Sequence, residues 1–279
     1  MRFEYPALPQ GVPLSEVEQQ ALCQEILAEI EGGQFKAVGT ASAENHSHWE
    51  EFWQFNLDLT RVPAYLRKAK LLRINKRFHR MERSTDEMYW YMCIRHSVLS
   101  TYFKNIQIIY EFGCGNGWNL RAAHQLYPFK QMVGLDWANS AIKELNRLGR
   151  LKTGGWIRGR QFDFFDPDYD LKLEPGSAVW TVGALEQTGQ HWGPFLEYLL
   201  ANKPAICVHV EPIVEWYDPK NPVDATAIAY HLARNYWQGF PSRMEDLARQ
   251  GKVEILQKQR SYVGSKYLEG YSLFVWRPL

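Results

Sequence analysis

The chain has 279 residues and a formal net charge of +1; 46% of its residues are hydrophobic and 23% are charged. This length suffices for one α/β domain with an addition, and the near-neutral charge argues against a nucleic acid as the partner. No apolar run approaches the ~20 residues of a membrane-spanning helix, and the start lacks the apolar core of a signal peptide. We therefore expect a cytoplasmic protein, and the four scattered cysteines indicate reduced thiols rather than a zinc site or a disulfide framework.

Residues 1–84 are expected to form a helical extension ahead of the main domain. Ser15 and Glu18 have the spacing of a capping box, and the helix that they open should stop at the glycine pair 32–33. The segment 45–59 is rich in aromatic residues and predicts a second, short helix. We interpret its aromatic side chains as packing residues.

Residues 61–83 contain nine Lys or Arg side chains and a single acid, Glu82. Apolar residues recur there at helical spacing with basic residues beside them, which predicts an amphipathic basic helix. One interpretation is a solvated helix face whose long side chains cover the core. The other is a contact surface for an anionic partner, such as a phosphorylated sugar, a lipid-linked saccharide or a membrane surface. The apolar stripe consists of Leu71, Ile74, Phe78 and Met81, and the basic stripe of Lys70, Arg73, Arg77 and Arg80.

Ser84 and Glu87 again have the spacing of a capping box, and they open a helix that we expect to run to about Phe103. Beyond it, apolar strand-like runs alternate with helical patterns, which predicts an α/β fold. The predicted strands are 106–112, 131–136, 157–163, 177–182 and 205–210, followed by an antiparallel pair near 252–260 and 270–276. The predicted helices are 117–127, 139–149, 193–201, 224–238 and 242–251.

The most informative stretch begins with the apolar run 108–110, followed by Glu111 and by glycines at every second position, Gly113, Gly115 and Gly117. This pattern predicts a strand, a tight turn and a helix. Glycines permit positive φ and let a ligand approach the main chain, while the helix N-terminus offers unpaired N–H groups. The third glycine falls one place early for the dinucleotide fingerprint, and no Gly-Lys-Ser/Thr follows as in a phosphate loop.

The stretch resembles the E/D-x-G-x-G-x-G motif of the class I S-adenosylmethionine (SAM)-dependent methyltransferases. Asp136 ends the second predicted strand, where a carboxylate can accept both ribose hydroxyls of a bound nucleoside. The resemblance makes Asp163, at the end of the next strand, the partner of the adenine amino group. It covers roughly residues 85–279 and implies SAM as the cofactor and S-adenosylhomocysteine as the product. The expected cofactor-binding residues are Glu111, Gly113, Cys114, Gly115, Asn116, Gly117, Asp136, Trp137, Asp163 and Phe164.

The resemblance also implies the fold. We expect a seven-stranded Rossmann-like methyltransferase sheet with helices on both faces and an antiparallel last strand. In such proteins a helical N-terminal segment commonly lies over the cofactor and the substrate. We therefore divide the chain into an N-terminal extension or lid, 1–84, and a SAM-binding methyltransferase domain, 85–279.

Residues that follow the fourth and fifth predicted strands lie outside the SAM pattern and are the candidates for catalysis. His191 is the preferred base, because an imidazole titrates near neutral pH and because this residue lies in a loop. Glu186 or Glu211 is the alternative base, with a pKa raised by burial. A third hypothesis, which we do not favour, is that Glu186, Glu211 and Glu215 hold a divalent metal ion. The candidates for substrate binding are Arg234, Asn235 and Tyr236.

The favoured acceptor is a hydroxyl group of a sugar or glycan, because aromatic and carboxylate side chains suit sugar faces and hydroxyls. Several stretches, among them 184–187 and 211–218, look like uncharacterised methyltransferases associated with bacterial surface polysaccharides. The alternatives are a small-molecule O- or N-methyltransferase of secondary metabolism and a SAM-binding protein that has lost catalysis. A nicotinamide dehydrogenase is disfavoured by Trp118, which follows the third glycine. The oligomeric state stays open.

Overall fold

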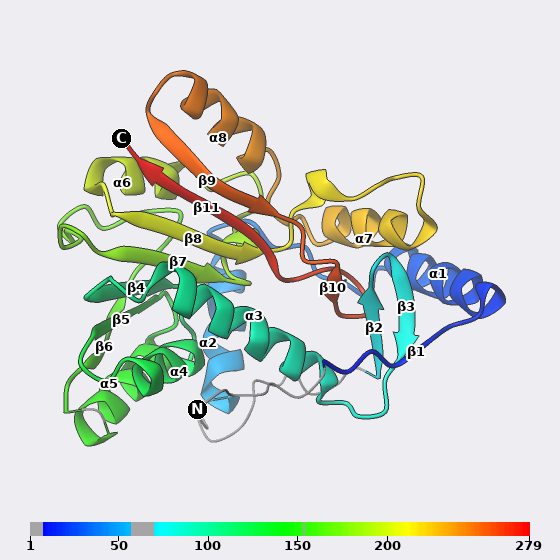
Figure 1. The fold of residues 1–279 in the computed structure, drawn as a ribbon, viewed down its shortest axis with the longest axis horizontal. Coiled ribbons are helices and arrows are strands. Elements are labelled where there is room, and N and C mark those ends of the chain that lie inside the picture. Colours follow the sequence, from blue (N-terminus) through cyan, green and yellow to red (C-terminus); the bar gives the residue numbers. More distant parts are fainter. Residues whose placement is uncertain (1–7, 57–69, 153) are drawn as a thin grey trace.

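The computed structural model describes residues 8–56, 70–152 and 154–279, which form two β-sheets surrounded by helices (Figure 1). The larger sheet has seven strands in the order β6-β5-β4-β7-β8-β11-β9. Strands β4 to β8 run parallel, and β11 is antiparallel to both of its neighbours. This arrangement confirms the predicted α/β, Rossmann-like methyltransferase sheet. Its strands are β4 (Ile108–Phe112), β5 (Gln131–Asp136), β6 (Ile157–Gln161), β7 (Ala178–Val182), β8 (Ile206–Glu211), β9 (Val253–Gln259) and β11 (Ser272–Pro278).

Helices cover both faces of the large sheet. On one face, α3, α4 and α5 contribute Val98, Leu120 and Leu145 to a buried cluster with the strands. On the other face, α6 and α8 contribute Phe195 and Met244 to a second cluster. Each such side chain stabilises the fold by about 1.5–3 kcal/mol, because it leaves water completely. These helices are α3 (Asp86–Tyr102), α4 (Trp118–Leu126), α5 (Asn139–Lys152), α6 (Gly193–Asn202) and α8 (Phe240–Arg249).

A ligand site is expected where the chain direction reverses within the sheet. Strands β4, β5 and β6 follow one another in the chain and lie in that order toward one edge of the sheet. The next strand, β7, lies on the other side of β4. In open α/β sheets the crevice outside the carboxyl ends of the strands at such a switch point holds the ligand. The glycine turn directly follows β4, so this motif lies at the switch point.

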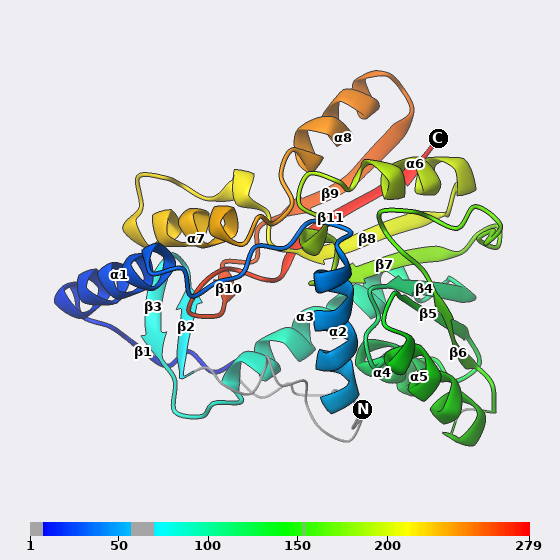
Figure 2. The same ribbon diagram turned by 180° about the vertical axis from the view of Figure 1, so that it is seen from behind.

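Two N-terminal helices were predicted, and both are present. Helix α1 (Glu16–Glu31) begins with the expected capping box, in which Glu18 N–H donates to Ser15 Oγ and Ser15 N–H donates to the Glu18 carboxylate. Helix α2 (Ala43–Phe55) begins after Ser42, whose hydroxyl accepts from Asn45 N–H. Figure 2 shows α2 standing beside the carboxyl ends of the sheet strands, apart from α1.

The predicted basic helix of residues 61–83 is wrong over its described part. Residues 70–83 contain a hairpin, β2 (Leu71–Ile74) and β3 (Arg77–Arg80), within a small sheet of order β1-β3-β2-β10. The two intervening residues, Asn75 and Lys76, both have positive φ, as a two-residue hairpin turn of this type requires. The outer strands are β1 (Val12–Pro13) and β10 (Val263–Gly264). Residues 61–69 lie outside the described residues.

Three basic side chains of this hairpin bind other elements of the fold. Arg77 pairs with Glu16 and Arg80 pairs with Glu18, both on α1. Arg73 is buried and donates to the Thr226 hydroxyl and to the Val223 carbonyl of α7 (Pro222–Ala233). The N-terminal residues are thus joined to the C-terminal half through these contacts and through the pairing of β2 with β10.

Several predicted helix boundaries differ from the structure; among them, α5 continues past Gly149 to Lys152. Helix α3 begins at Asp86 without a side-chain cap, and Glu87 is buried instead of closing a capping box. Helix α7 stops at Ala233 because Asn235 adopts positive φ, and α8 begins at Phe240, ahead of the expected Ser242. None of the described helices is long and apolar enough to span a membrane.

Candidate active site

The glycine turn after β4 requires its glycines. Gly113, Gly115 and Gly117 have φ of 70°, 51° and 77°, in the left-handed region that favours glycine. The first two glycines also have no room for a side chain. A Cβ on Gly113 would lie 2.2 Å from the Ala184 Cβ, and one on Gly115 would lie 2.1 Å from Cζ2 of Trp53. The turn is therefore covered by the loop after β7 and by helix α2.

Asp136 links the end of β5 to this turn. Its Oδ2 accepts from Gly115 N–H at 2.8 Å and its Oδ1 accepts from Ala138 N–H at 2.9 Å. Burial raises the pKa of this carboxyl to about 6, although the backbone N–H donors oppose the shift. Each carboxylate oxygen has a second lone pair, so Asp136 can still accept two further hydrogen bonds.

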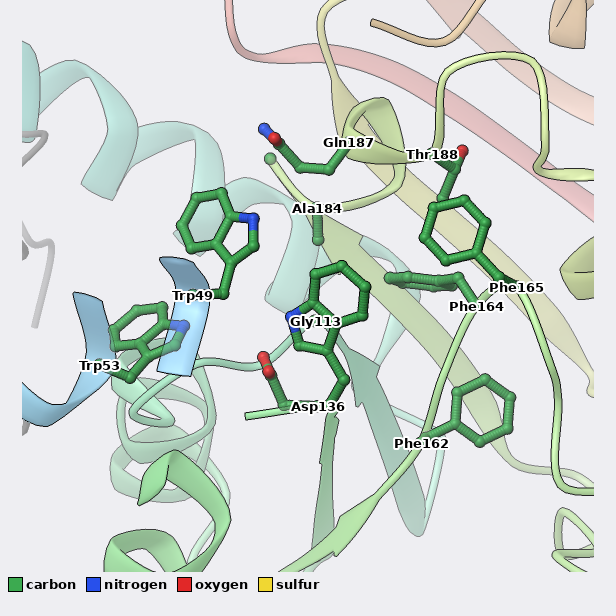
Figure 3. Close-up of a pocket in the computed structure, with 12 residues that line it drawn as sticks. Trp49, Trp53, Gly113, Asp136, Phe162, Phe164, Phe165, Ala184, Gln187 and Thr188 are labelled. Atoms are coloured by element: carbon green, nitrogen blue, oxygen red, sulfur yellow. The ribbon is translucent and has the colours of Figure 1, made fainter. Parts of the chain in front are cut away.

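An aromatic cavity opens above Asp136. Figure 3 shows Trp49 and Trp53 on the α2 side, Phe164 and Phe165 on the opposite side, and Asp136 between them. Such a space suits a flat ring held between side chains. The cavity is lined by Trp49, Trp53, Gly113, Asp136, Trp137, Phe162, Phe164, Phe165, Gly183, Ala184, Gln187 and Thr188.

Asp163 lies two residues beyond β6, which ends at Gln161, and stands between two residues of the aromatic cavity, but it does not line that cavity in the described part of the chain. Its Oδ1 accepts from Phe165 N–H at 2.8 Å, and its Oδ2 lies 3.5 Å from His46 Nε2. His46 also contacts Trp137, with ring centroids 4.0 Å apart. Asp163 thus shapes the cavity wall through Phe165.

Glu111 is buried at the end of β4. Its Oε1 accepts from Asn119 Nδ2 at 2.8 Å, and Asn119 Oδ1 accepts in turn from the Tyr91 hydroxyl and Arg95. Its Oε2 has no hydrogen-bond partner among the described residues. Burial raises the pKa of Glu111 to about 8, with Asp136 adding to the shift and Asn119 opposing it.

A second space, the carboxyl cavity, adjoins the glycine turn and extends between α2, α3 and the loop after β7. About 1280 Å³ of space lies between its walls, part of it open to solvent. Eight buried side-chain nitrogen or oxygen atoms lack a hydrogen-bond partner in the described part of the chain, and four of them belong to residues on this wall. These four atoms are Glu87 Oε2, Glu111 Oε2, Glu186 Oε2 and Gln187 Oε1.

Glu186 and Glu211 lie together but have different environments. The Glu211 carboxylate accepts from the backbone N–H groups of Ala184, Leu185 and Glu186 at 3.1–3.3 Å. Glu186 lines the carboxyl cavity, and its Oε1 accepts from Gln187 Nε2 at 2.7 Å. Burial, with the neighbouring Glu211, raises the pKa of Glu186 well above its usual range. Glu211 therefore holds the loop, while Glu186 faces the space where chemistry can occur.

The other candidates divide into those near the cavities and those elsewhere. His191 is exposed and is absent from the described residues that line either cavity. Arg234 donates to the Lys36 carbonyl and Asn235 donates to the Val38 carbonyl, so these two side chains hold the segment before α2. Tyr236 lines the carboxyl cavity.

The remaining residues of the glycine turn support its shape. Asn116 accepts from Trp118 N–H at 3.1 Å and donates to the Asn56 carbonyl at 3.0 Å, which ties α2 to the turn. Cys114 is buried, and burial raises the pKa of its thiol. A thiol held neutral in this way is a packing group and a poor nucleophile.

The three acids of the metal hypothesis do not converge. Glu215 is exposed, and its Oε1 accepts from Gly239 N–H at 2.6 Å, at the start of α8. Glu186 and Glu211 lie beside the loop after β7 instead. Within the described residues, no group of three or more His, Cys, Asp or Glu side chains is placed to hold a metal ion.

Several site residues escaped the sequence analysis. Trp49 and Trp53 were interpreted as packing residues, but they line both cavities. Glu87, Tyr91 and Tyr271 line the carboxyl cavity from α3 and from the segment before β11. The aromatic density of the segment 45–59 was the signal that could have identified the first two.

Comparison with known proteins supports the fold. No protein-family model matches the sequence, and no curated protein matches it either. Among solved structures, the chain is similar to the pyocyanin biosynthetic protein PhzM, with a TM-score of 0.50 and 14% identity over 70% of this chain and 57% of PhzM. It is also similar to the methyltransferase domain of bacterial CtHen1, with a TM-score of 0.49 and 16% identity over 67% of this chain and 98% of that domain.

A third similar structure is the N,N-8-amino-8-demethyl-D-riboflavin dimethyltransferase RosA from Streptomyces davawensis, with a TM-score of 0.48 and 13% identity over 70% of this chain and 57% of RosA. The chain thus spans little more than half the length of PhzM and RosA. The likeness to PhzM and the strand order agree, and together they show that this chain has a Rossmann-like methyltransferase fold.

Proposed function

We propose that the protein is a SAM-dependent methyltransferase that acts on a small-molecule acceptor. The observation that carries this proposal is the link between Asp136 and the glycine turn, in which the carboxylate accepts from Gly115 N–H and still borders the aromatic cavity. A carboxylate in this position can accept both hydroxyls of a ribose. The absence of Lys and Arg from residues 108–118 suits a nucleoside ligand without phosphate.

The residues present fit SAM at both ends of the molecule. Trp137 and Phe164 line the aromatic cavity, which suits the adenine ring. The buried Oε2 of Glu111, which has no partner among the described residues, suits the N–H donors of an amino-acid group, because a buried acceptor without a partner is costly. We assign the remaining contacts to the main chain of residues 113–117.

When bound, SAM supplies an electrophilic methyl group, so the chain must position the acceptor, exclude water and remove a proton. Position supplies much of the rate in such a transfer. We assign proton removal to Glu186, because its Oε2 is buried without a hydrogen-bond partner among the described residues and because the residue lines the carboxyl cavity. This assignment replaces His191, whose exposed side chain contacts the Phe165 ring from outside and is absent from the described residues that line either cavity.

We infer a small molecule as the acceptor, in place of the sugar or glycan hydroxyl that the sequence favoured. The carboxyl cavity lies between α2, α3 and the loop after β7, and eight of the 22 described residues that line it are aromatic, which suits a small ligand. PhzM is a pyocyanin biosynthetic protein, which agrees with this class of acceptor. A SAM-binding protein without catalysis is the second candidate.

The proposal is tested by incubating the protein with SAM and a library of small amines, phenols, alcohols and nucleotide sugars. Mass spectrometry would follow both S-adenosylhomocysteine and products heavier by one methylene group. We expect enzyme-dependent methylation of a small-molecule member and no such product with the Asp136→Ala variant. Methylation of the nucleotide sugars alone would show that the acceptor is a sugar, as the sequence analysis favoured. Binding of SAM without any product would favour the non-catalytic candidate.

A further inference from the structure

We infer that the carboxyl cavity recognises the protonated amino group of its acceptor through Glu87 and Glu186. This inference rests on the proposed function, because it names the acceptor class for the same site. It starts from two buried carboxyl groups that reach one cavity from separate elements, Glu87 from α3 and Glu186 from the loop after β7. Their side chains belong to residues that are only 3% and 6% exposed.

Each of the two carboxyl groups has one oxygen engaged and one oxygen unpaired. Glu87 Oε1 accepts from the Tyr271 hydroxyl at 2.8 Å, and Glu186 Oε1 accepts from Gln187 Nε2 at 2.7 Å. The Oε2 atom of each residue lacks a hydrogen-bond partner among the described residues, as does Gln187 Oε1. The cavity wall therefore offers three unused oxygens, which is the complement of a ligand with several N–H donors.

The ionisation of Glu87 and Glu186 also supports an ammonium group as the ligand. Burial raises the pKa of Glu87 to about 7 and that of Glu186 well above its usual range, the latter helped by Glu211. A cation within a few ångströms favours the charged form of a carboxyl group, so a bound ammonium ion would lower both pKa values. A neutral hydroxyl can donate one hydrogen bond to a carboxylate, but it carries no charge that would stabilise the ionised form.

Two arginines lie near the carboxyl cavity, and each donates hydrogen bonds to other described residues. Arg234, which lies close enough to interact with Glu186, donates to the Lys36 carbonyl and to the Tyr236 hydroxyl. Arg95 donates to Asn119 and lies over the Trp118 ring, 4.1 Å from its centroid. No Lys or Arg is among the described residues that line the cavity.

Aromatic residues complete a site of this kind. The aromatic residues that line the cavity include Tyr230, Tyr271 and Trp53. Tyrosine and tryptophan rings attract cations through the negative potential of their faces, and the attraction grows when the cation is desolvated. Carboxylates and aromatic rings together form a site for an ammonium group on an apolar body.

The test compares 2-phenylethylamine with 2-phenylethanol, which share one skeleton and differ in the amino or hydroxyl group. Calorimetry would measure the binding of each to the protein saturated with S-adenosylhomocysteine at pH 7. We expect the amine to bind at least ~10-fold more tightly than the alcohol, the scale of a charge-assisted hydrogen bond. Equal affinity of the two probes, tighter binding of the alcohol, or no binding of the amine would overturn the inference.

The variants Glu87→Gln and Glu186→Gln assign the preference to these residues. Glutamine keeps an oxygen for Tyr271 or for Gln187, so each variant removes the charge with little change of shape. We expect each to reduce the preference for the amine at least ~5-fold while S-adenosylhomocysteine affinity stays within ~2-fold of wild type. The control Glu82→Gln, at an exposed position just before α3, should leave the preference unchanged. An undiminished preference in both cavity variants would refute the assignment.

Proton release gives a readout that a merely structural role would not produce. Because an entering ammonium ion ionises the two carboxyl groups, binding of the amine should release protons to the buffer. The observed heat should therefore differ between phosphate and Tris buffers at pH 7, and the difference should shrink in both variants. Binding without proton release would contradict the inference. Failure of S-adenosylhomocysteine to bind at all would instead count against the proposed function.

Discussion

Trp53 of α2 lies against Gly115 of the glycine turn, so closely that a Cβ on this glycine would come within 2.1 Å of the indole Cζ2. The contact joins the N-terminal extension to the motif that we assign to the cofactor. The hydrogen bond from Asn116 Nδ2 to the Asn56 carbonyl joins the same two segments. Helix α2 is therefore part of the candidate site, and changes on either side of this contact should affect ligand binding.

Gly115→Ala should disrupt this contact and lower the affinity for S-adenosylhomocysteine at least ~10-fold. The variant places a methyl group where Trp53 lies and forces alanine into left-handed backbone geometry at φ 51°. The matched control is Gly176→Ala, at φ 75°, where a Cβ would have no atom of the described residues within 4 Å. Both variants should lose about 1–2 kcal/mol of stability from backbone strain. Only Gly115→Ala should lose affinity, and equal affinities measured by calorimetry would contradict this account of the turn.

The stability of the ligand-free protein should fall as the pH rises from about 6.5 to about 8.5. Glu87 and Glu111 have pKa values raised from 4.5 to about 7 and about 8, so the folded protein binds more protons than the unfolded chain in this range. The stabilisation from each group is fully present below pH 4.5 and is lost as the pH rises through its folded pKa, at up to ~1.4 kcal/mol per pH unit.

The titration of the buried histidines falls below the pH range of this prediction. The pKa values of His209 and His231 are lowered by burial to about 3 and about 4, so these residues affect stability only below about pH 6.5. Glu111→Gln keeps an oxygen for Asn119 Nδ2 but cannot ionise. Thermal denaturation at several pH values should show a shallower fall for this variant than for wild type. An identical slope would show that Glu111 does not titrate in this range.

Glu186→Gln should lower methyl-transfer turnover by ~10²-fold or more, as for the loss of a general base, while S-adenosylhomocysteine still binds. His191→Ala is the matched variant, because the sequence favoured this residue as the base and the structure places its side chain at the surface. We expect the histidine variant to keep its activity with an acceptor identified in the library. The opposite pattern, an inactive histidine variant and an active Glu186→Gln, would restore the first assignment.

Local sequence patterns predicted the elements that depend on neighbouring residues. The alternation of strands and helices, the glycine turn and the position of Asp136 at the end of β5 all follow from periodicity and from the conformational freedom of glycine. The hairpin at 71–80 was mistaken for a helix because two short strands around a two-residue turn repeat apolar residues at intervals close to a helical turn. The positive φ of Asn75 and Lys76 distinguishes the hairpin turn from a continuous helix.

The carboxyl cavity depends on long-range packing and could not be predicted in the same way. Glu87 had the spacing of a capping residue, and its burial follows only from the packing of α3 beside Tyr271. Glu186 and Glu211 follow neighbouring strands, so their proximity was foreseeable. That Glu211 accepts three backbone N–H groups, while Glu186 keeps an unpaired oxygen, depends on the fold of the loop after β7.

The central claim is that the glycine turn and Asp136 bind SAM, and calorimetry with S-adenosylhomocysteine tests it most directly. The account predicts one saturable site in the wild-type protein and an affinity lower by about 1–3 kcal/mol in Asp136→Ala, because ribose hydroxyls and Gly115 N–H lose their acceptor. Absence of binding to the folded wild-type protein at millimolar ligand, or an unchanged affinity in the variant, would contradict it.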